Sequence, residues 1–324
     1  MNERDHEFGH ASVEKTTPVS VTGLCFLAIT VAACTPDRDP EPPPEPAPPA
    51  RSTPELQVIV VGSGTPLADP ARGGPATAVA MGERVLLFDA GAGVLRGLTA
   101  AGSDPSRVAH VFVTHLHSDH TVGLDELLFG AWTIGRDRPL VVHGPDGIEP
   151  MVAGLQAAFE RDVAIRAGGL EGADPRGATA RTVVVEPGVV HRERGIRVDA
   201  FAVEHGSWEH AYGYRVEGAG RVVVISGDTS PTDAVVDACD GCDVLVHEVY
   251  STAGWRARPE AFRAYHAAFH TSGEQLGRLA ARARPRLLVL THLLFFDQPP
   301  AQILEEVRGH FDGEVVIAED GERY

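Results

Sequence analysis

The amino-acid sequence predicts an α/β fold, in which short buried strands alternate with helices. Apolar runs of strand length occur at residues 56–61, 84–88, 108–113, 221–225 and 287–290. Helices are expected between them, at residues 94–101, 122–132, 149–159 and 273–283. Strands and helices that interleave along a chain are typical of layered α/β architectures. Several of the predicted strands run directly into histidine or aspartate, which places polar chemistry at strand ends.

The first expected strand, 56–61, leads into the glycine-rich turn 62–64. Residues 76–80 and 84–88 follow as a hairpin. The glycine-rich segment 167–180 is expected to be a surface loop. Beyond it, strands are expected at 182–185 and 196–203, and the second alternates apolar and polar residues, as a strand with one buried face does.

The composition argues against a nucleic-acid partner. The chain has 324 residues, a net charge of −17 and one lysine, Lys15. A strongly acidic chain repels phosphate backbones unless it carries a local basic stripe. The densest arginine group flanks a predicted helix end and forms no such stripe; its members are Arg278, Arg282, Arg284 and Arg286.

The first 54 residues are expected to lie outside the folded domain. Val19–Ala33 is an apolar run that suits the core of an export signal better than a membrane span, although a weak membrane anchor is the alternative. It ends at Cys34 in a pattern that resembles a lipobox, but the preceding leader carries more acids than bases. We expect a lipoprotein-type signal peptide over 1–34, a Pro/Glu-rich tether over 35–54 and one folded domain over 55–324. The protein would then be exported and held at the membrane by a lipid on Cys34.

Two cysteines lie in the folded domain, Cys239 and Cys242, and they are separated by two residues. In an oxidising compartment such a pair forms a small-loop disulfide, and free thiols are the alternative. No thioredoxin-like context or second cysteine pair accompanies them.

The chemistry centres on Thr114-His115-Leu116-His117-Ser118-Asp119-His120, directly after the strand 108–113. Side chains alternate across an extended chain, so His115 and His117 point the same way and can hold one ion. Asp119 and His120 then fall where a second ion could bind. Histidine nitrogen and carboxylate oxygen are ordinary zinc ligands, and paired ions are common in hydrolases.

This H-x-H-x-D-H motif resembles the first metal motif of the metallo-β-lactamase-fold hydrolases, and the resemblance covers nearly everything from about Leu56 onward. It implies a four-layered αββα sandwich. It also implies His205 as third ligand of the first ion, with His210 as a rival, Asp228 as a bridging carboxylate and His292 on the second ion. The implied metal set is His115, His117, Asp119, His120, His205, Asp228 and His292. Asp89 would orient a metal-bound histidine or, alternatively, cap a helix.

The resemblance implies two Zn²⁺ ions, with Mn²⁺ or Fe²⁺ as alternatives, and a bridging hydroxide as nucleophile. Asp119 would also orient that hydroxide. Elements similar to those of the ribonuclease Z-like branch assign Glu248 to orient His270, the general acid, although Thr271 or Ser272 could instead cap the next helix with His270 incidental. His266 is expected to be structural. His143, His191 and His310 are expected to lack partners.

Asp228 disfavours a β-lactamase, which lacks this bridging aspartate. Ribonuclease Z carries a tRNA-binding arm for which residues 215–225 leave no room. The compact layout resembles zinc-dependent arylsulfatases and phosphodiesterases, so we expect hydrolysis of a small sulfate or phosphate ester, the sulfate slightly favoured. A lactonase and a non-catalytic binding module are the alternatives, and a homodimer is one option for the oligomeric state. Four aromatic side chains could wall the substrate pocket or belong to the core: Trp132, Trp208, Phe295 and Phe296.

Overall fold

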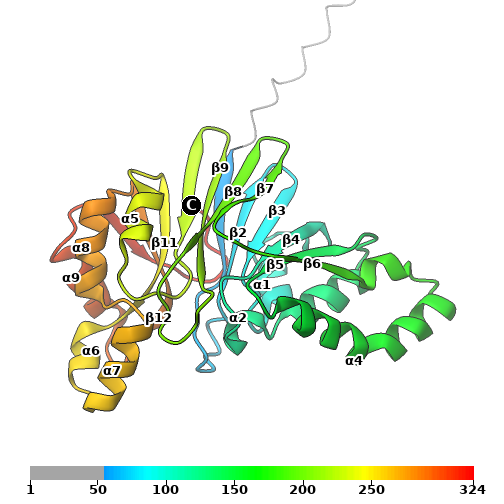
Figure 1. The fold of residues 1–324 in the computed structure, drawn as a ribbon, viewed down its shortest axis with the longest axis horizontal. Coiled ribbons are helices and arrows are strands. Elements are labelled where there is room, and N and C mark those ends of the chain that lie inside the picture. Colours follow the sequence, from blue (N-terminus) through cyan, green and yellow to red (C-terminus); the bar gives the residue numbers. More distant parts are fainter. Residues whose placement is uncertain (1–54) are drawn as a thin grey trace, which may run out of the picture. The chain divides into compact units, whose positions relative to one another are not determined.

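A computed structural model of the chain describes residues 55–324, in which two β-sheets are flanked by helices (Figure 1). The expected signal peptide, lipidated Cys34 and tether lie outside the described residues. Within 55–324, none of the helices has both the length and the apolar character that crossing a bilayer requires.

The first sheet has six strands in the order β1-β2-β3-β4-β5-β6. The pairs β1–β2 and β2–β3 are antiparallel, whereas β3 to β6 run parallel. The strands are β1 Leu56–Gly62, β2 Ala76–Met81, β3 Arg84–Phe88, β4 Val108–Phe112, β5 Leu140–Gly144 and β6 Ala180–Val184.

The second sheet has seven strands in the order β13-β12-β11-β10-β9-β8-β7. The strands β7 to β10 are antiparallel neighbours and β10 to β13 are parallel. They are β7 Gly188–Glu193, β8 Ile196–Ala202, β9 Tyr212–Gly218, β10 Arg221–Ile225, β11 Val244–Tyr250, β12 Leu287–Leu294 and β13 Glu314–Ile317.

Three apolar clusters define four layers. One cluster joins the facing sides of the two sheets and includes Phe88, Phe112 and Tyr214. A second lies between the first sheet and its helices, chiefly α1 Val94–Ala100 and α4 Ile148–Gly168. The third lies between the second sheet and α5 Asp233–Cys239, α8 Gly273–Ala283 and α9 Pro300–Arg308. The expected αββα sandwich is thus confirmed.

The segment expected to be one helix at 122–132 is divided. The short helix α2 Ser118–Thr121 ends just before this segment, which itself contains the π-helix η2 Glu126–Gly130 and the start of the short helix α3 Ala131–Thr133. Buried Arg136 donates to the carbonyls of Leu127 and Leu128 in η2, and also to that of Gly177 in the 3₁₀ turn η3 Pro175–Ala178. A further 3₁₀ turn, η1 Pro105–Arg107, precedes β4.

Other boundaries also differ from the sequence prediction. Helix α4 extends nine residues beyond 159, so the surface loop is shorter than expected. Strands β7 and β9 and helices α6 Thr252–Arg256 and α7 Glu260–Phe269 were not predicted. His266 lies in the last turn of α7, and His270 follows that helix instead of starting the next one. Strand β11 continues past Glu248 to Tyr250.

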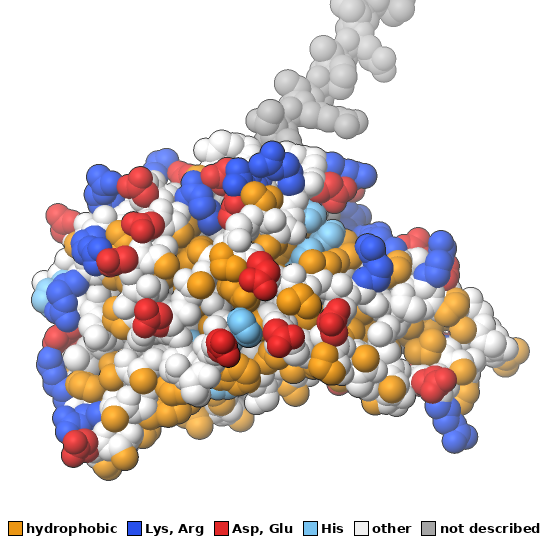
Figure 2. Space-filling model, viewed as in Figure 1, with side chains coloured by type: hydrophobic (Ala, Val, Ile, Leu, Met, Phe, Trp, Pro, Cys, Tyr) orange, Lys and Arg blue, Asp and Glu red, His pale blue; other side chains and the backbone are white. Residues whose placement is uncertain are grey.

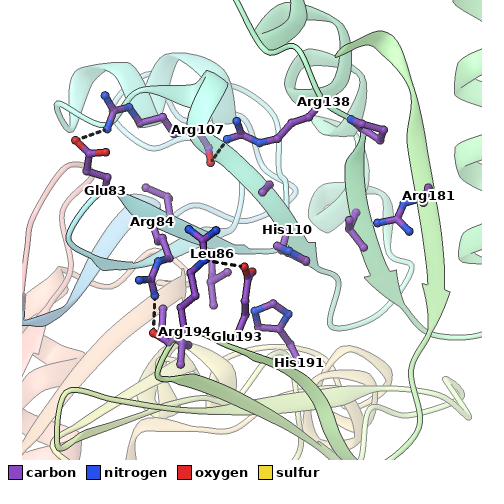
Figure 3. A pocket seen from close by; sticks show the side chains of 15 residues that line it. Glu83, Arg84, Leu86, Arg107, His110, Arg138, Arg181, His191, Glu193 and Arg194 are labelled. Atoms are coloured by element: carbon purple, nitrogen blue, oxygen red, sulfur yellow. Dashed lines mark hydrogen bonds and ion pairs between the residues drawn. The ribbon is translucent and has the colours of Figure 1, made fainter. Parts of the chain in front are cut away.

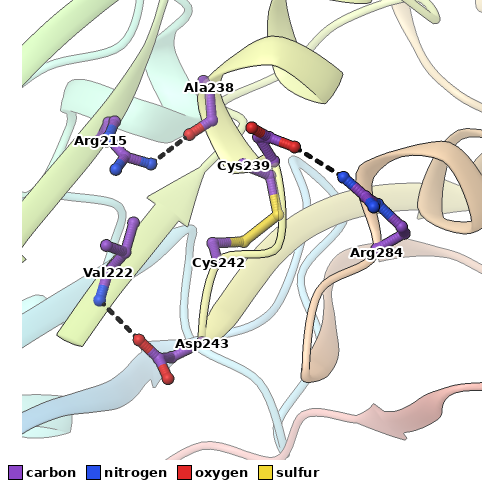
Figure 4. Close-up of a disulfide and its surroundings, with 8 residues drawn as sticks. Arg215, Val222, Ala238, Cys239, Cys242, Asp243 and Arg284 are labelled. Atoms are coloured by element: carbon purple, nitrogen blue, oxygen red, sulfur yellow. Dashed lines mark hydrogen bonds and ion pairs between the residues drawn. A yellow bond between two sulfur atoms is a disulfide. The ribbon is translucent and has the colours of Figure 1, made fainter.

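Cys239 and Cys242 form a disulfide, so the free-thiol alternative does not hold in this structure (Figure 4). The bond closes the turn between α5 and β11. Neighbouring contacts hold the same turn: Arg284 pairs with Asp240, and the Asp243 carboxylate accepts from the amide of Val222. The disulfide lies in the helix-side core of the second sheet, where it supports the fold.

Candidate metal centre

The predicted ligands meet because strands of both sheets end at one place. The loop after β4 and helix α2 supply His115, His117, Asp119 and His120 from the first sheet. The second sheet supplies His205 after β8, Asp228 after β10 and His292 in β12. All seven residues that the sequence singled out therefore converge, although they span 178 positions of the chain.

The first group consists of His115, His117, His205 and Asp228, whose ligand atoms all lie within 4.8 Å of one another. The Nδ1 atom of His117 is 2.9 Å from Nε2 of His115 and 3.1 Å from Nε2 of His205. Three imidazole nitrogens and a carboxylate oxygen around one point are a donor set suited to a transition-metal ion.

The second group contains Asp119, His120 and His292. The Nε2 atom of His292 is 3.3 Å from both Asp119 Oδ2 and Asp228 Oδ2, and His120 Nε2 is 3.3 Å from Asp228 Oδ2. Asp228 thus contacts both groups, which is the position expected of a bridging carboxylate.

The backbone at His292 is adapted to this role. Its φ angle is +45°, unusual for a residue with a side chain. The register between β11 and β12 shifts here, because Glu248 pairs with Thr291 and Val249 with Leu293. His292 is therefore the extra residue of a β-bulge, a device that redirects a side chain out of the ladder.

Surrounding groups fix the ring orientations. Asp89 accepts from Nδ1 of His120 at 2.8 Å and from the amide and hydroxyl of Thr114. Helix α1 begins after Gly93, so the helix-cap alternative for Asp89 is wrong. The Nδ1 atom of His205 donates to the carbonyl of Phe269 at 2.8 Å.

One contact favours a tautomer of His117 other than the one that would bind an ion through Nδ1. The indole N–H of Trp208 donates to Nε2 of His117 at 2.7 Å. A neutral imidazole that accepts at Nε2 carries its proton on Nδ1. An ion bound to Nδ1 would require the proton on Nε2, and the indole would then have to turn away.

The protein's own charges are strongly coupled here. Burial opposes ionisation of Asp228, but His292 and His120 outweigh it and hold its pKa well below the usual value. Burial also opposes a charge on His120, yet Asp228 and Asp89 raise its pKa well above that of free histidine. Burial keeps His115 neutral by lowering its pKa. The side chains thus supply both anionic and neutral donors.

Glu248 and His270 lie beside the shared aspartate. The Nδ1 atom of His270 is 3.4 Å from Glu248 Oε2 and 3.8 Å from Asp228 Oδ2. The other oxygen, Glu248 Oε1, accepts from the amide of Thr271 at 2.6 Å. Burial raises the pKa of Glu248 well above its ordinary value and lowers that of His270 to about 4. In the absence of a metal ion, these shifts favour a protonated carboxyl next to a neutral ring.

The helix-capping alternative is also present. Ser272 caps α8 in a capping box with Gln275, whereas the Thr271 hydroxyl donates to the carbonyl of Thr229. Ser272 therefore caps α8 while His270 still lies beside Glu248 and Asp228.

The donor set fits metal ions. Among the described residues, Nε2 of His120 is buried without a hydrogen-bond partner, although it points between two carboxylates. Several imidazole nitrogens face each other at hydrogen-bond distance, an arrangement that an ion between them would satisfy. His115, His117, His205 and Asp228 could hold one ion, and Asp119, His120, Asp228 and His292 a second.

The structure also places the rival ligand and the four aromatic residues that the sequence suggested for the site. His210, the rival of His205, is exposed and outside these groups. Trp132 is buried in the core behind the first sheet, so it does not wall the site. Phe296 packs against Tyr250 and Phe262, while Trp208 touches the His117 ring. Phe295 lies under Arg72.

A cavity of about 580 Å³ opens beside the centre and reaches Asp119. The segment 65–74 forms one wall, and Ser118 and Val122 form another. Two arginines, Arg72 and Arg96, also line it. Neither arginine has a local signal in the sequence, because only the packing of the 65–74 loop and helix α1 beside Asp119 brings them to this cavity.

This fold and this paired His/Asp donor set define a metal-dependent hydrolase that acts on ester bonds. Residues 84–293 match the family model described as the beta-lactamase superfamily domain. The chain belongs to this superfamily, in its ribonuclease Z-like part.

Ribonuclease Z of Mycobacterium sp. (strain KMS) is 33% identical over 245 residues, which covers 74% of this chain and 84% of that protein. The metallo-beta-lactamase fold protein YhfI from Bacillus subtilis has a TM-score of 0.65 at 22% identity, covering 83% of this chain and 98% of that one. Human tRNase Z, short form, has a TM-score of 0.62 at 22% identity, with the same coverages. These two structures support the fold.

Proposed function

We propose that the protein hydrolyses a small phosphodiester, with a sulfate ester as the second choice. The observation that carries the proposal is the convergence of all seven His/Asp donors on one point, with Asp228 common to both groups. The similarity to ribonuclease Z places the phosphodiester ahead of the sulfate ester that the sequence alone favoured.

Two bound ions, which we propose to be Zn²⁺ with Mn²⁺ or Fe²⁺ as alternatives, would activate water as a nucleophile and stabilise negative charge on the ester. The roles of the chain's own residues follow from their positions. Asp119, next to the cavity, orients the attacking water. His270 gives a proton to the leaving group, and Glu248, 3.4 Å from Nδ1 of that ring, holds the proton that replaces it.

The cavity beside Asp119 suits a compact anionic ester. Arg72 and Arg96 can attract a phosphate or sulfate group, and Leu67 and Val122 expose apolar surface for an aromatic or aliphatic leaving group. Basic and apolar side chains in the same cavity support an ester with one hydrophobic substituent.

Precursor tRNA is the alternative substrate, and the relatives' names favour it. Against it stands the connection between β9 and β10, where only Ala219 and Gly220 separate the two strands and leave no arm. On the face shown in Figure 2, basic side chains lie mainly near the edges, acidic side chains occupy the middle, and no continuous basic stripe crosses the face. With the net charge of −17, these features support a small substrate.

We also propose that the enzyme acts outside the cytoplasm as a lipoprotein anchored through Cys34. This proposal rests on the sequence of residues 1–54 alone. Metabolic labelling with a fatty acid, compared between the full chain and Cys34→Ala, would test it.

The full chain, loaded with Zn²⁺, should be assayed against bis(p-nitrophenyl) phosphate, p-nitrophenyl sulfate, an aryl lactone and a precursor tRNA. We expect turnover of the phosphodiester that falls at least about 100-fold in Asp228→Ala. His205→Ala should lose activity similarly, whereas His210→Ala is the matched control and should retain it. Lactone turnover alone would replace the proposal with a lactonase, and tRNA cleavage alone would replace it with a processing nuclease.

The role of His270 has its own readout. His270→Ala should slow a diester with a poor alkoxide leaving group by about 100-fold or more, but one with nitrophenolate far less, because only the poor leaving group needs a proton. His266→Ala, in the preceding helix, is the control. Equal losses with both leaving groups would assign His270 to the metal site and not to proton transfer.

A protein that neither binds metal nor turns over any substrate would be a binding module on this scaffold.

A further inference from the structure

A second histidine cluster lies apart from the candidate metal centre. His110 is in β4, His143 at the end of β5 and His191 in β7, so both sheets contribute to it. The expectation that His143 and His191 lack partners is therefore wrong. It failed because β7 was not predicted, and only the packing of the two sheets brings these three segments together.

The cluster lies at a cavity of about 690 Å³ between β3–β5 and the β7–β8 hairpin. His110 and His191 line the cavity, and Figure 3 shows their rings next to each other. His143 lies beside His110 on the neighbouring strand and is only 4% exposed. Imidazoles from both sheets thus line the space between the sheets at this point.

The ring nitrogens are placed as metal ligands are. One ring nitrogen from each residue lies within 4.8 Å of those of the other two. The separation between His110 Nδ1 and His143 Nε2 is 3.1 Å, equal to the separation between His117 and His205 in the candidate centre. The ring centroids of His110 and His191 are 4.4 Å apart. A β-bulge immediately before His191 sets the direction of that side chain.

The chemical state of the rings also suits a ligand role. Burial lowers the pKa of His110 to about 4 and that of His143 to about 3. Both rings are therefore neutral near pH 7, so an ion would not have to displace protons from them. Within the described chain, the only polar contact of the His143 ring is with His110, and its Nδ1 has no partner. Hydrogen bonding does not explain why a histidine is buried here.

The side chains at the rim of the cavity limit the kinds of metal ion that the three histidines could bind. It carries five arginines and two glutamates, and the glutamates pair with Arg107 and Arg194. Calcium and magnesium require several carboxylate or carbonyl oxygens, which this site does not offer. Neutral imidazoles favour zinc, copper, nickel or cobalt. The exposed arginines would draw an anion to the open side of such an ion, which would offset their repulsion of the cation.

We propose that His110, His143 and His191 form a second, separate site for a divalent transition-metal ion, reached through the arginine-rimmed cavity. The site does not depend on the proposed hydrolase activity, because it shares no residue with the candidate metal centre.

The test counts metal in the full chain. Protein freed of metal with a chelator is dialysed against Zn²⁺ or Co²⁺, and the bound metal is measured by mass spectrometry for wild type, His143→Gln and His191→Ala. Each variant should hold one equivalent fewer than wild type while phosphodiester turnover stays unchanged. His310→Ala is the matched control. This exposed histidine contacts Arg278, so the expectation that it lacks a partner is also wrong, but it lies outside the cluster and the variant should keep the full count. Asp228→Ala should lose metal from the other centre and retain the equivalent at the histidine cluster.

Equal metal content in wild type and both cluster variants would overturn the proposal. His191 is only partly buried and lies in a hairpin, so His191→Ala keeps the test decisive if His143→Gln does not fold. A failure of the hydrolase proposal appears differently: turnover is absent although the histidine cluster still binds its ion.

Discussion

A single buried histidine outside both metal clusters links folding to pH. His247 in β11 has no exposed surface, and its Nε2 has no partner among the described residues. Burial lowers its pKa to about 4, against an ordinary value of 6.5. In the unfolded chain the ring takes up a proton as the pH falls through 6.5, but in the folded chain it does not do so until about 4. The unfolded state therefore binds more protons in this window, and stability decreases as the pH falls.

We predict that this histidine alone lowers the free energy of unfolding by up to about 3 kcal/mol between pH 7 and pH 4, since each pKa unit corresponds to about 1.36 kcal/mol. His247→Leu should flatten the pH dependence by that amount. Urea unfolding of chelator-treated protein at a series of pH values measures it. His310→Ala, on an exposed residue, should retain the wild-type slope, and a wild-type slope in His247→Leu would contradict the prediction.

At the residue scale, the sequence predicts the ligand positions best where a short motif contains several donors. The strand followed by H-x-H-x-D-H places four donors within six positions, so local geometry determines their arrangement. His205 and Asp228 were assigned through the family resemblance, which expects a ligand at the end of each of these apolar strands. Arg72 and Arg96 have no such local signal, and neither does the tautomer that Trp208 favours at His117. The positions of the two arginines and the tautomer of His117 depend on contacts between segments that are distant in the sequence.

At the scale of elements, the loop between β1 and β2 is held by one carboxylate near the chain's last residues. Asp320 accepts from the amide and hydroxyl of Ser63 at 2.9 and 2.7 Å and from the amide of Gly73 at 2.6 Å. Arg72 reinforces the attachment by donating to the carbonyl of Ala318. The loop forms a wall of the cavity beside Asp119, so Asp320 acts on substrate binding through that wall.

Asp320→Ala should raise the KM for the phosphodiester several-fold with little change in kcat, because the loop contacts substrate but holds no reacting group. Loss of these bonds should also lower the free energy of unfolding by about 2 kcal/mol. Steady-state kinetics and thermal unfolding test both effects. Glu319→Ala is the control. Unchanged KM and melting temperature would show that the loop keeps its position without Asp320.

Two of the strands that the sequence did not predict share a physical cause. Strand β9 contains two glycines and β7 has exposed and partly buried residues, so neither shows a clear apolar pattern. Both become strands because β8 pairs with each of them, a long-range effect that local preference does not encode. The π-helix at Glu126–Gly130 has the apolar spacing of an α-helix and was predicted as one.

At the scale of the whole described region, the two sheets depend on each other for chemistry. The first sheet contributes four donors to the candidate metal centre and the second contributes three. The second histidine cluster also draws on both. The αββα sandwich followed from the family resemblance, while strand order alone would have given only an alternation of strands and helices.

The last residue of the chain pairs with the first strand: the amide and carbonyl of Tyr324 both bond to Val58. The ends of the described domain are therefore neighbours, and a linker of roughly five residues from Tyr324 to Glu55 would span the gap. A circular permutant joined there and opened at the exposed turn after Leu170 should fold with every strand pairing retained. Its circular dichroism and metal content should match those of the native order, and a molten product would contradict this. The same packing of strands and helices could then be reached with more than one order of the elements along the chain.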